Sequence, residues 1–432
     1  MKKIKALFNN KIVKNAGWLI FGKIIQMLIN FIVGILTARY LGPDNYGLIS
    51  YAGAYTAFFS SICTLGINSV IVKEFIDIPK EEGKIIGTAL GLRAVSSLFS
   101  AITIIAISLV LDAGEPTTVW VVTLCSIGVI FNIFDTFNYW FQSKLQSKKT
   151  AIASLIAYSV TALYKVILLI AGKSVIYFAL ATSVDYICIA VILIIFYIKD
   201  KSGKISFSKC YAKELLRKSV HFILPGLMVA IYGQTDKIML KHMISAAEIG
   251  YYATAVSICN VWCFVLSAII DSLNPPIMQA YNEDKSKFQR LNIILYSIVF
   301  YISVFVSLLF TVFGKYVISV LYGAEYLPAV APLRIITWYT AFSYLGMARN
   351  AWVVCENKQK YLKYIYFSAA ISNVMLNIIL IPLWGASGAA AASLIAQIIT
   401  TMVVPFFIKD MRKNSIMMVK AILLKGLKGD KK

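Results

Sequence analysis

The sequence predicts an all-α integral membrane protein: twelve transmembrane helices in two six-helix bundles, with a central cavity between the halves. Two observations lead to this fold class. Of the 432 residues, 59% are hydrophobic and only 14% are charged, with no polar block long enough for a soluble domain. The 42 Lys and Arg residues also alternate: of the 36 outside long apolar stretches, 32 fall in every second connecting segment. Short basic loops face the cytoplasm, so this alternation predicts the topology.

Twelve stretches are long enough to cross the hydrocarbon core as helices, which takes about twenty apolar residues each. They cover residues 16–38, 48–70, 85–111, 117–141, 150–171, 175–198, 219–240, 248–275, 291–313, 330–353, 364–383 and 386–408. The third and the eighth are long enough to tilt in the bilayer. An even number of spans places both termini on one side, and their basic tails place them in the cytoplasm.

The longest basic connection divides the chain into two sets of six spans. We expect four parts: an N-terminal bundle over 1–200, a cytoplasmic linker over 201–218, a C-terminal bundle over 219–409 and a basic cytoplasmic tail over 410–432. A weak repeat supports a duplication, because YGLISYA at 46–52 resembles IGYYATA at 249–255. Because each half has six spans, the two repeats have the same orientation and are related by a pseudo-two-fold axis along the membrane normal. A substrate path between the halves is the usual consequence.

Both tails carry apolar residues at helical spacing among lysines, such as Ile416, Val419 and Leu423. We expect the tails to lie as helices on the inner leaflet, so anionic phospholipids are predicted partners. A net charge of +22 would favour nucleic acid in a soluble protein. Here the charge lies beside apolar spans, so no nucleic-acid partner is expected.

Ten charged residues remain inside the predicted spans, apart from Glu248 at the first position of the eighth. The cations are Lys23, Arg93, Lys165, Lys237, Arg334 and Arg349, and the acids are Asp135, Asp185, Asp236 and Asp271. A charge at a helix centre costs about 2.5 to 3.5 kcal/mol on insertion scales, so a purely structural bundle would not keep ten. Such residues are expected to face a cavity and to serve a transport pathway.

Amide side chains recur at helical spacing beside these charges and predict which faces look inward. The candidates for the cavity lining are Gln26, Asn30, Asn132, Gln234, Asn373 and Asn377. Hydrogen bonding between helices explains such positions equally well.

The cations outnumber the acids, which predicts a cavity for an anionic head group. Lys23, Arg93 and Arg349 are the favoured ligands; Arg334 and Lys237 are further candidates, although snorkelling to the membrane surface explains these two equally well. The acids Asp135, Asp185 and Asp236 are either ion-pair partners of the cations or include the site of a coupling H+ or Na+.

No enzyme activity, catalytic residue, metal site or further cofactor is expected. The seven cysteines form no CxxC pair, and the outer loops are too short for a catalytic domain. The tyrosines near the outer turns, including Tyr251 and Tyr252, are expected to be membrane-interface residues.

Four segments carry a resemblance to a known family: ARYLGPDNYG at 38–47, YGQTDK at 232–237, YGAEY at 322–326, and the region of Asn373, Asn377 and Gly385. On these segments the chain resembles the polysaccharide-biosynthesis flippases, which translocate O-antigen and capsule repeat units. They belong to the multidrug/oligosaccharidyl-lipid/polysaccharide exporter (MOP) superfamily. The resemblance covers nearly the whole chain.

The resemblance implies a flippase in the cell inner membrane that moves an undecaprenyl-pyrophosphate-linked oligosaccharide to the outer leaflet by alternating access. Partners would then be the polyprenyl-pyrophosphate-linked glycan and other membrane proteins of polysaccharide assembly. Two alternatives stay open. A multidrug antiporter of the same superfamily is disfavoured by the basic interior, and a membrane polysaccharide polymerase or ligase is disfavoured by the short outer loops.

Overall fold

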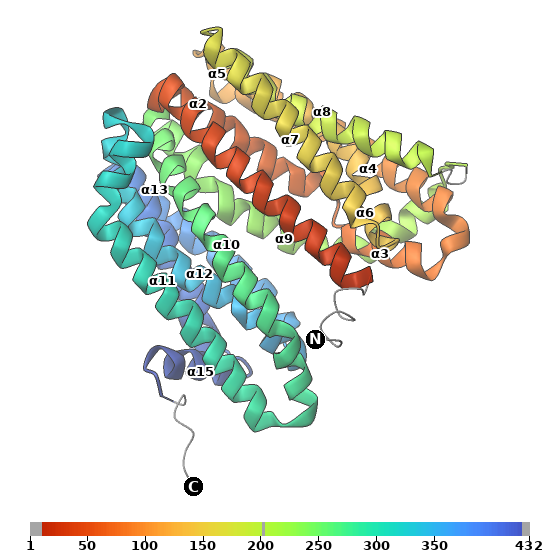
Figure 1. Ribbon diagram of the computed structural model, residues 1–432, viewed down its shortest axis with the longest axis vertical. Helices are drawn as coiled ribbons and strands as arrows, with labels where there is room; N and C mark the ends of the chain where they lie inside the picture. Colours follow the sequence, from red (N-terminus) through yellow and green to blue (C-terminus); the bar gives the residue numbers. More distant parts are fainter. Residues whose placement is uncertain (1–10, 201–203, 426–432) are drawn as a thin grey trace. The chain divides into compact units, whose positions relative to one another are not determined.

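The computed structural model describes residues 11–200 and 204–425, and almost all of these residues are helical (Figure 1). Eight of the described helices are long and apolar enough to cross a membrane, and a ninth is added if the two parts of α9 form one bent span. The predicted all-helical, multi-pass membrane class is therefore confirmed. Residues 1–10 and 426–432 of the predicted tails and 201–203 of the predicted linker lie outside the described residues.

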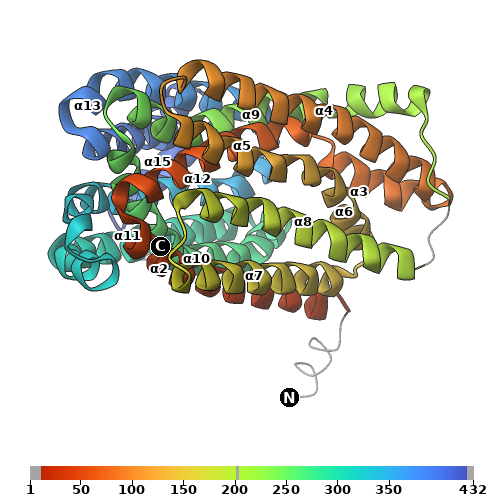
Figure 2. The ribbon, with the colours of Figure 1, turned by 90° about the horizontal axis from the view of Figure 1, so that it is seen from above.

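The chain forms two compact units, Met1–Ala230 and Ile231–Lys432. The helices of the first unit are α2 (Lys11–Cys63), α3 (Asn68–Asp77), α4 (Glu82–Leu111), α5 (Pro116–Ile130), α6 (Thr136–Ser143), α7 (Ser147–Ile170) and α8 (Val175–Lys199), with 3-10 turns η1 (Pro79–Glu81) and η2 (Phe131–Asp135). Figure 2 shows α7 and α8 side by side, and α2 packs along α7. The unit boundary falls inside α9 (Lys209–Met243).

The long helix α2 contains a break that separates the first two predicted spans. Gly42 has φ 71° and ψ 171°, a left-handed conformation that glycine adopts without steric cost. Pro43 follows it and lacks the N–H that a continuous helix would need. The sequence Gly-Pro therefore ends one helical segment and starts another.

The core of the first unit lies where α3, α4, α6, α8 and the start of α9 meet. Its largest buried side chain is Trp140, which packs with Ile85 and Leu215. The indole Nε1 donates to Glu82 Oε2 at 3.1 Å, so burial leaves no unpaired donor there. Lys144 forms an ion pair with the same carboxylate at 2.9 Å.

Residues 204–207, which we call the strap, run along a glycine face of α4. A Cβ added at Gly83 would lie 2.1 Å from the carbonyl oxygen of Lys204, and one at Gly87 would lie 2.4 Å from that of Ser206. The Ser206 N–H donates to the Gly83 carbonyl at 3.1 Å. The predicted cytoplasmic linker is therefore packed against the first unit over this stretch, and it is helical from Lys209 onward.

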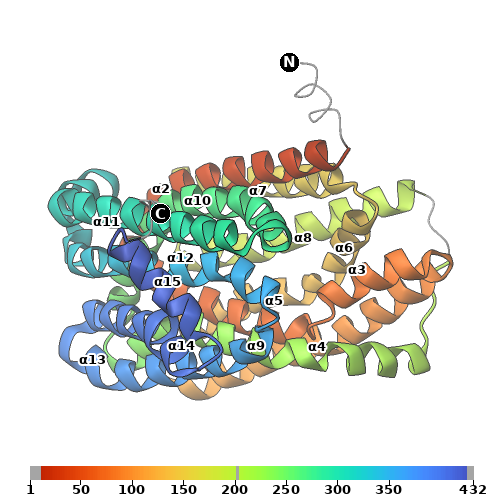
Figure 3. The same cartoon turned by 90° about the horizontal axis from the view of Figure 1, so that it is seen from below.

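The described part of the second unit contains three helices of 37 or 38 residues and three shorter ones. They are α10 (Ala246–Glu283), α11 (Lys285–Tyr322), α12 (Val330–Cys355), α13 (Leu362–Ile398), α14 (Val404–Phe407) and α15 (Arg412–Ile422), with 3-10 turns η3 (Ala324–Ala329) and η4 (Gln359–Tyr361) and a π-helical segment η5 (Ile399–Val403). Figure 3 shows α15 lying across α11 and α12. The core includes Tyr296, Leu345 and Trp352.

A second glycine break divides α13 between the last two predicted spans. Gly385 has φ 53° and ψ −129°, which is non-helical. The Glu248 carboxylate of α10 accepts from the Ala386 N–H at 2.5 Å, so an acidic side chain caps the new helical segment. The positive φ explains why glycine is favoured there, and a Cβ at Gly385 would also displace the Glu248 carboxylate, whose Oε2 would lie 2.4 Å away.

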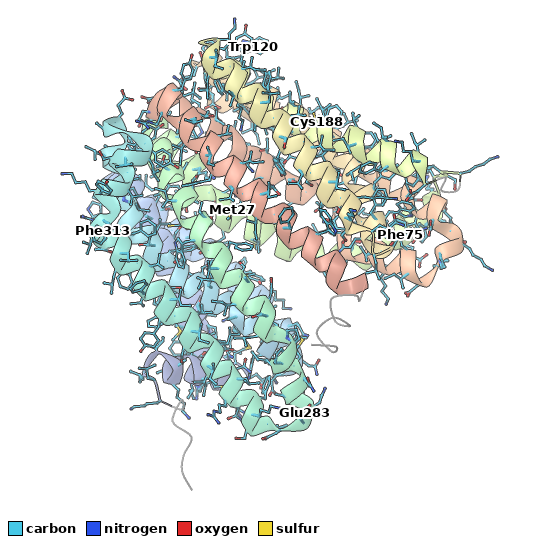
Figure 4. All side chains as sticks on the ribbon, in the orientation of Figure 1. Met27, Phe75, Trp120, Cys188, Glu283 and Phe313 are labelled. Carbon is cyan, nitrogen blue, oxygen red and sulfur yellow. The ribbon has the colours of Figure 1, made fainter. Side chains whose placement is uncertain are left out.

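Large apolar side chains cover the outer surfaces of both units. Trp120 of α5 and Phe313 of α11 are among them, and more than half of each side chain is exposed (Figure 4). Contiguous exposed apolar surface of this extent is typical of helices in contact with lipid.

Candidate functional site

Five side chains of the second unit form one buried polar cluster, which we call the Asp236 cluster. Asp236 of α9 is 3% exposed and accepts four hydrogen bonds. The Asn373 and Asn377 amides donate to Oδ1 at 3.0 and 2.6 Å. The Tyr252 and Ser393 hydroxyls donate to Oδ2 at 2.6 Å each. Hydrogen bonds to a charged acceptor are the strong ones, so the cluster can hold an ionised carboxylate away from water.

Three helices supply the cluster, and the local structure of α13 explains its geometry. Asn373 and Asn377 are one helical turn apart and share a face. Ser393 lies beyond the Gly385 break, so α13 returns to the same carboxylate with its second segment. The Asn373 amide also donates to Ser393 Oγ at 3.3 Å, which joins the two segments.

The chemistry of the Asp236 cluster fits a monovalent cation or a proton. It offers one carboxylate and several neutral oxygens, which suit a hard cation of low charge. The amide oxygen of Asn377 is buried and has no hydrogen-bond partner. A buried acceptor of this kind is costly unless something pairs with it, and a cation would do so.

A cavity of about 310 Å³ opens onto this cluster. Besides Asp236, its polar lining includes Tyr232, Gln234, Lys237, Asn260, Thr340 and Ser343. The lining contains one cation and one anion, so hydroxyl and amide groups give this cavity its polarity. Lys237 donates to Gln234 Oε1 at 3.4 Å. Of the predicted lining residues, Gln234 lies in the cavity, while Asn373 and Asn377 are buried behind it on the carboxylate.

The first unit holds a smaller polar cavity of about 160 Å³ around Lys23. Gln26 lies one turn away on the same face of α2, and Asn138, Thr150 and Ser154 complete the polar lining. The close approach of α2 and α7 depends on Gly22, where a Cβ would lie 3.3 Å from that of Ala151. Lys23 is exposed, so its ammonium group remains available to an anion.

Arg93 lies inside the first unit, with only 1% of its surface exposed. Its Nη1 donates to the carbonyl of Asn132 at 3.3 Å and lies 3.8 Å from the Asp135 carboxylate. Its Nη2 donates to the side chain of Asn68, and its guanidinium lies 5.4 Å from the Tyr139 ring centre. The carbonyl belongs to η2, a 3-10 turn where backbone hydrogen bonding is poorer than in an α-helix. The role of Arg93 as a pyrophosphate ligand stays a prediction.

Arg349 of the second unit makes a comparable contact. It is buried, and its Nη1 donates to the carbonyls of Thr400 and Thr401 at 3.4 Å each. Both carbonyls belong to the π-helical segment η5, where the regular hydrogen-bond pattern of an α-helix is interrupted. Each unit thus directs a buried arginine at backbone oxygens of an irregular segment. A substrate-binding role for Arg349 also stays a prediction.

The remaining predicted residues are spread over both units. Asp185 accepts a hydrogen bond from the Thr161 hydroxyl at 3.4 Å, and it lies close enough to Lys165 for the two charges to attract. Asn30 and Arg334 are exposed. Asn132 donates from its side chain to Ser60 Oγ at 3.3 Å, a helix-to-helix contact.

Two members of the Asp236 cluster were missed at the level of sequence. Tyr252 is buried and bonded to the carboxylate, so its predicted position at the membrane interface is wrong. Ser393 stands in the run GASGAAAAS, where it looks like a small helix-packing residue. The usable signal was the repeat, because Tyr252 lies within the motif at 249–255 that resembles the motif at 46–52.

Comparisons with known proteins agree with this architecture. A family described as polysaccharide biosynthesis protein matches residues 12–281. The capsular polysaccharide biosynthesis protein CapF of Staphylococcus aureus is 22% identical over 403 residues, which cover 92% of this chain and 99% of that protein. The uncharacterized membrane protein MJ1068 of Methanocaldococcus jannaschii is 22% identical over 260 residues, or 57% of this chain and 51% of that protein.

Two solved structures share the fold at 15% sequence identity. An inward-facing multidrug resistance MATE family transporter of the MOP superfamily gives a TM-score of 0.71, covering 91% of this chain and 95% of that chain. The lipid II flippase MurJ in an inward closed conformation also gives 0.71, covering 94% and 91%. Because the family match covers well over half of the sequence, the recognition made from sequence motifs is confirmed. The chain belongs to the polysaccharide biosynthesis protein family.

Proposed function

We propose that this protein is a flippase that moves an undecaprenyl-pyrophosphate-linked oligosaccharide from the cytoplasmic to the outer leaflet, for assembly of a surface polysaccharide such as O-antigen or capsule. The observation that carries the proposal is the Asp236 cluster, a buried carboxylate next to a polar cavity in a membrane protein of this family. A buried charge in a membrane helix is expensive and points to a transport pathway.

The Asp236 cluster would couple transport to a cation. Asp236, Asn373, Asn377 and Ser393 would hold H+ or Na+, which neutralises the carboxylate. The unpaired amide oxygen of Asn377 supports a bound cation rather than a purely structural role. The cavity beside the cluster gives water and ions a route to it.

The cavity around Lys23 would receive the pyrophosphate. A lysine ammonium is a compact point charge suited to phosphate oxygens. The neighbouring hydroxyls of Thr150 and Ser154 and the amides of Gln26 and Asn138 can donate further hydrogen bonds. Arg93 and Arg349 are the other favoured candidates from the sequence, and both donate to backbone oxygens. The further candidates are Lys237, which lines the cavity beside Asp236, and Arg334, which is exposed.

Twelve spans are the topology that we infer for this mechanism. Breaks at Gly42 and Gly385 divide two of the eight candidate spans, and α9 and α12 add two more. Twelve spans with basic loops on one side would place both termini in the cytoplasm of an inner-membrane protein. The two six-helix halves, related along the membrane normal, would expose the substrate path to each side in turn.

A multidrug antiporter is the alternative that the shared fold raises, and deletion of the gene discriminates between the two. We expect loss of surface glycan, accumulation of its lipid-linked precursor inside the cell and unchanged drug tolerance. Complementation by wild type should restore the glycan, and Asp236→Asn should not. Asp271→Asn is the matched control, because Asp271 is an exposed acid outside the cluster. Altered drug tolerance with intact surface glycan would exclude the proposed substrate.

A further inference from the structure

The C-terminal helix α15 is fixed to the second unit by one of its faces. Asn414 is buried and donates to the Tyr296 hydroxyl of α11 at 2.7 Å. At the other end of α15, the Ala421 carbonyl accepts from Ser297 Oγ at 3.1 Å. Both contacts are specific polar bonds between α15 and a long apolar helix.

The spacing of these contacts gives the direction of α15. Tyr296 and Ser297 are consecutive on α11, whereas their partners Asn414 and Ala421 are seven residues apart on α15. Seven residues of helix extend about 10 Å, but one residue advances only about 1.5 Å. The helix α15 therefore crosses α11 instead of running along it, as Figure 3 shows. A helix that crosses a membrane-spanning helix in this way lies near the plane of the membrane.

The contacts also give the depth of α15. Arg290 is the last charged residue of α11 before an uncharged stretch that ends at Lys315. Tyr296 is six residues beyond Arg290, and Tyr301, which donates to the Ile422 carbonyl at 2.6 Å, is eleven beyond it. These positions are about 9 to 16 Å along the helix from Arg290. Helices bound at a membrane surface bury their apolar face about 5 to 10 Å into the boundary, so the Tyr296 contact is at that level and the Tyr301 contact is deeper.

The opposite face of α15 is exposed and combines apolar with basic side chains. Ile416, Val419 and Leu423 are 42%, 40% and 56% exposed and follow one another at helical spacing. Lys413 and Lys420 are exposed beside them. Exposed apolar residues flanked by lysines are the pattern of a helix that inserts its apolar face among anionic head groups.

This face continues from the lipid-facing end of the preceding span. Arg412 Nε donates to the Phe406 carbonyl at 3.1 Å, and its guanidinium lies 5.4 Å from the centre of the Phe406 ring. Phe406 and Phe407 end the last candidate span and are themselves exposed. The apolar surface of the span therefore passes directly into the exposed face of α15.

We propose that the exposed face of α15 is a binding surface for anionic phospholipid at the membrane boundary, independent of the translocated substrate. The buried face docks the helix on α11, and the exposed face joins that end of the second unit to the lipid surface. Charge complementarity between the lysines and acidic head groups selects anionic over zwitterionic lipid.

The test places an environment-sensitive fluorophore on the exposed face of the full-length protein. Cys188, Cys210 and Cys355 are first replaced by Ser, because the other four cysteines are buried. Val419→Cys then carries the label, and Ser286→Cys, exposed in the first turn of α11, is the matched control. Both proteins are reconstituted in phosphatidylcholine vesicles with and without phosphatidylglycerol.

We expect the emission from position 419 to shift to the blue when phosphatidylglycerol is added, and the label at position 286 to show no such shift. Lys413→Gln combined with Lys420→Gln should abolish the lipid dependence, and high salt should weaken it. Equal emission in both vesicle types would overturn the proposal. A shift that depends on protein concentration, or cross-linking between two Val419→Cys chains, would also overturn it, since the occupant would then be a second copy. None of these fluorescence and cross-linking results depends on the transported substrate.

Discussion

Replacement of Asp236 separates the structural role of its cluster from a role in ion binding. In Asp236→Asn, the new amide can direct its oxygen at Asn373 and Asn377 and its NH2 at Tyr252 and Ser393. The two hydroxyls can rotate to accept, so every contact of the cluster can be kept. We expect this variant to fold with a stability within about 1 kcal/mol of wild type, as for a volume-conserving change.

Asp236→Leu removes both acceptors and leaves the four donors without their partner. Hydrogen bonds between membrane helices are worth about 0.6 kcal/mol each on average, which gives a loss of about 2.4 kcal/mol. The loss is greater if the donors stay buried and dry, since each unsatisfied group costs about 1 to 3 kcal/mol. We therefore expect Asp236→Leu to be clearly less stable than Asp236→Asn.

The assay is thermal unfolding of purified protein in detergent, with Na+ replaced by choline in one series and with pH varied in another. A cation at 100 times its Kd stabilises the folded state by about 2.7 kcal/mol. Wild type should gain stability from one of the two ions, and Asp236→Asn should lose that gain. The reasoning is refuted if Asp236→Leu is as stable as wild type, or if Asp236→Asn responds to the same ion to the same extent.

Three further predictions concern other parts of the chain. Lys23→Gln should reduce glycan translocation in vesicles at least tenfold and Lys23→Arg should retain more, because both cations can contact phosphate; equal rates would exclude this contact. Gly87→Val should displace the strap and expose it to trypsin, whereas Gly53→Val, with nothing within 4 Å, should not; equal cleavage would contradict the packing described. A hydrogen bond from Tyr361 is the main reason that the pKa of Asp410 is lowered from its usual value of 3.8. This contact therefore stabilises the start of α15 at neutral pH, and the stabilisation is lost as the pH falls below 3.8. Protection of the α15 amides, taken relative to the intrinsic exchange rate at each pH, should therefore fall on acidification in wild type and stay constant in Asp410→Asn.

The membrane class and most span positions could be read from the sequence, because hydropathy and loop charge act locally. Hydropathy also placed span boundaries around Gly42 and Gly385, and the structure adds that the backbone is non-helical at these two glycines. The strap could not be predicted. Its packing on Gly83 and Gly87 depends on two segments that are far apart along the chain.

The polar residues were recognised individually, but their grouping was not. Asp236, Asn373 and Asn377 stood among the candidates, yet spacing along separate helices does not reveal which of them meet. Arg93 and Arg349 were predicted to contact substrate because an unpaired cation in a span needs an anion or water. The structure directs them at backbone oxygens of η2 and η5, and such irregular segments leave no clear pattern in sequence. Their contact with substrate stays a prediction.

The most direct measurement of the central claim is translocation by the purified protein in proteoliposomes. A labelled undecaprenyl-pyrophosphate-linked oligosaccharide is placed in one leaflet, and its appearance in the other is followed with and without a gradient of Na+ or H+. We expect wild type to translocate the lipid and to respond to one of the gradients, and we expect Asp236→Asn to lose the response while Asp271→Asn keeps it. Absence of translocation by wild type, or an unchanged gradient response in Asp236→Asn, would contradict this account.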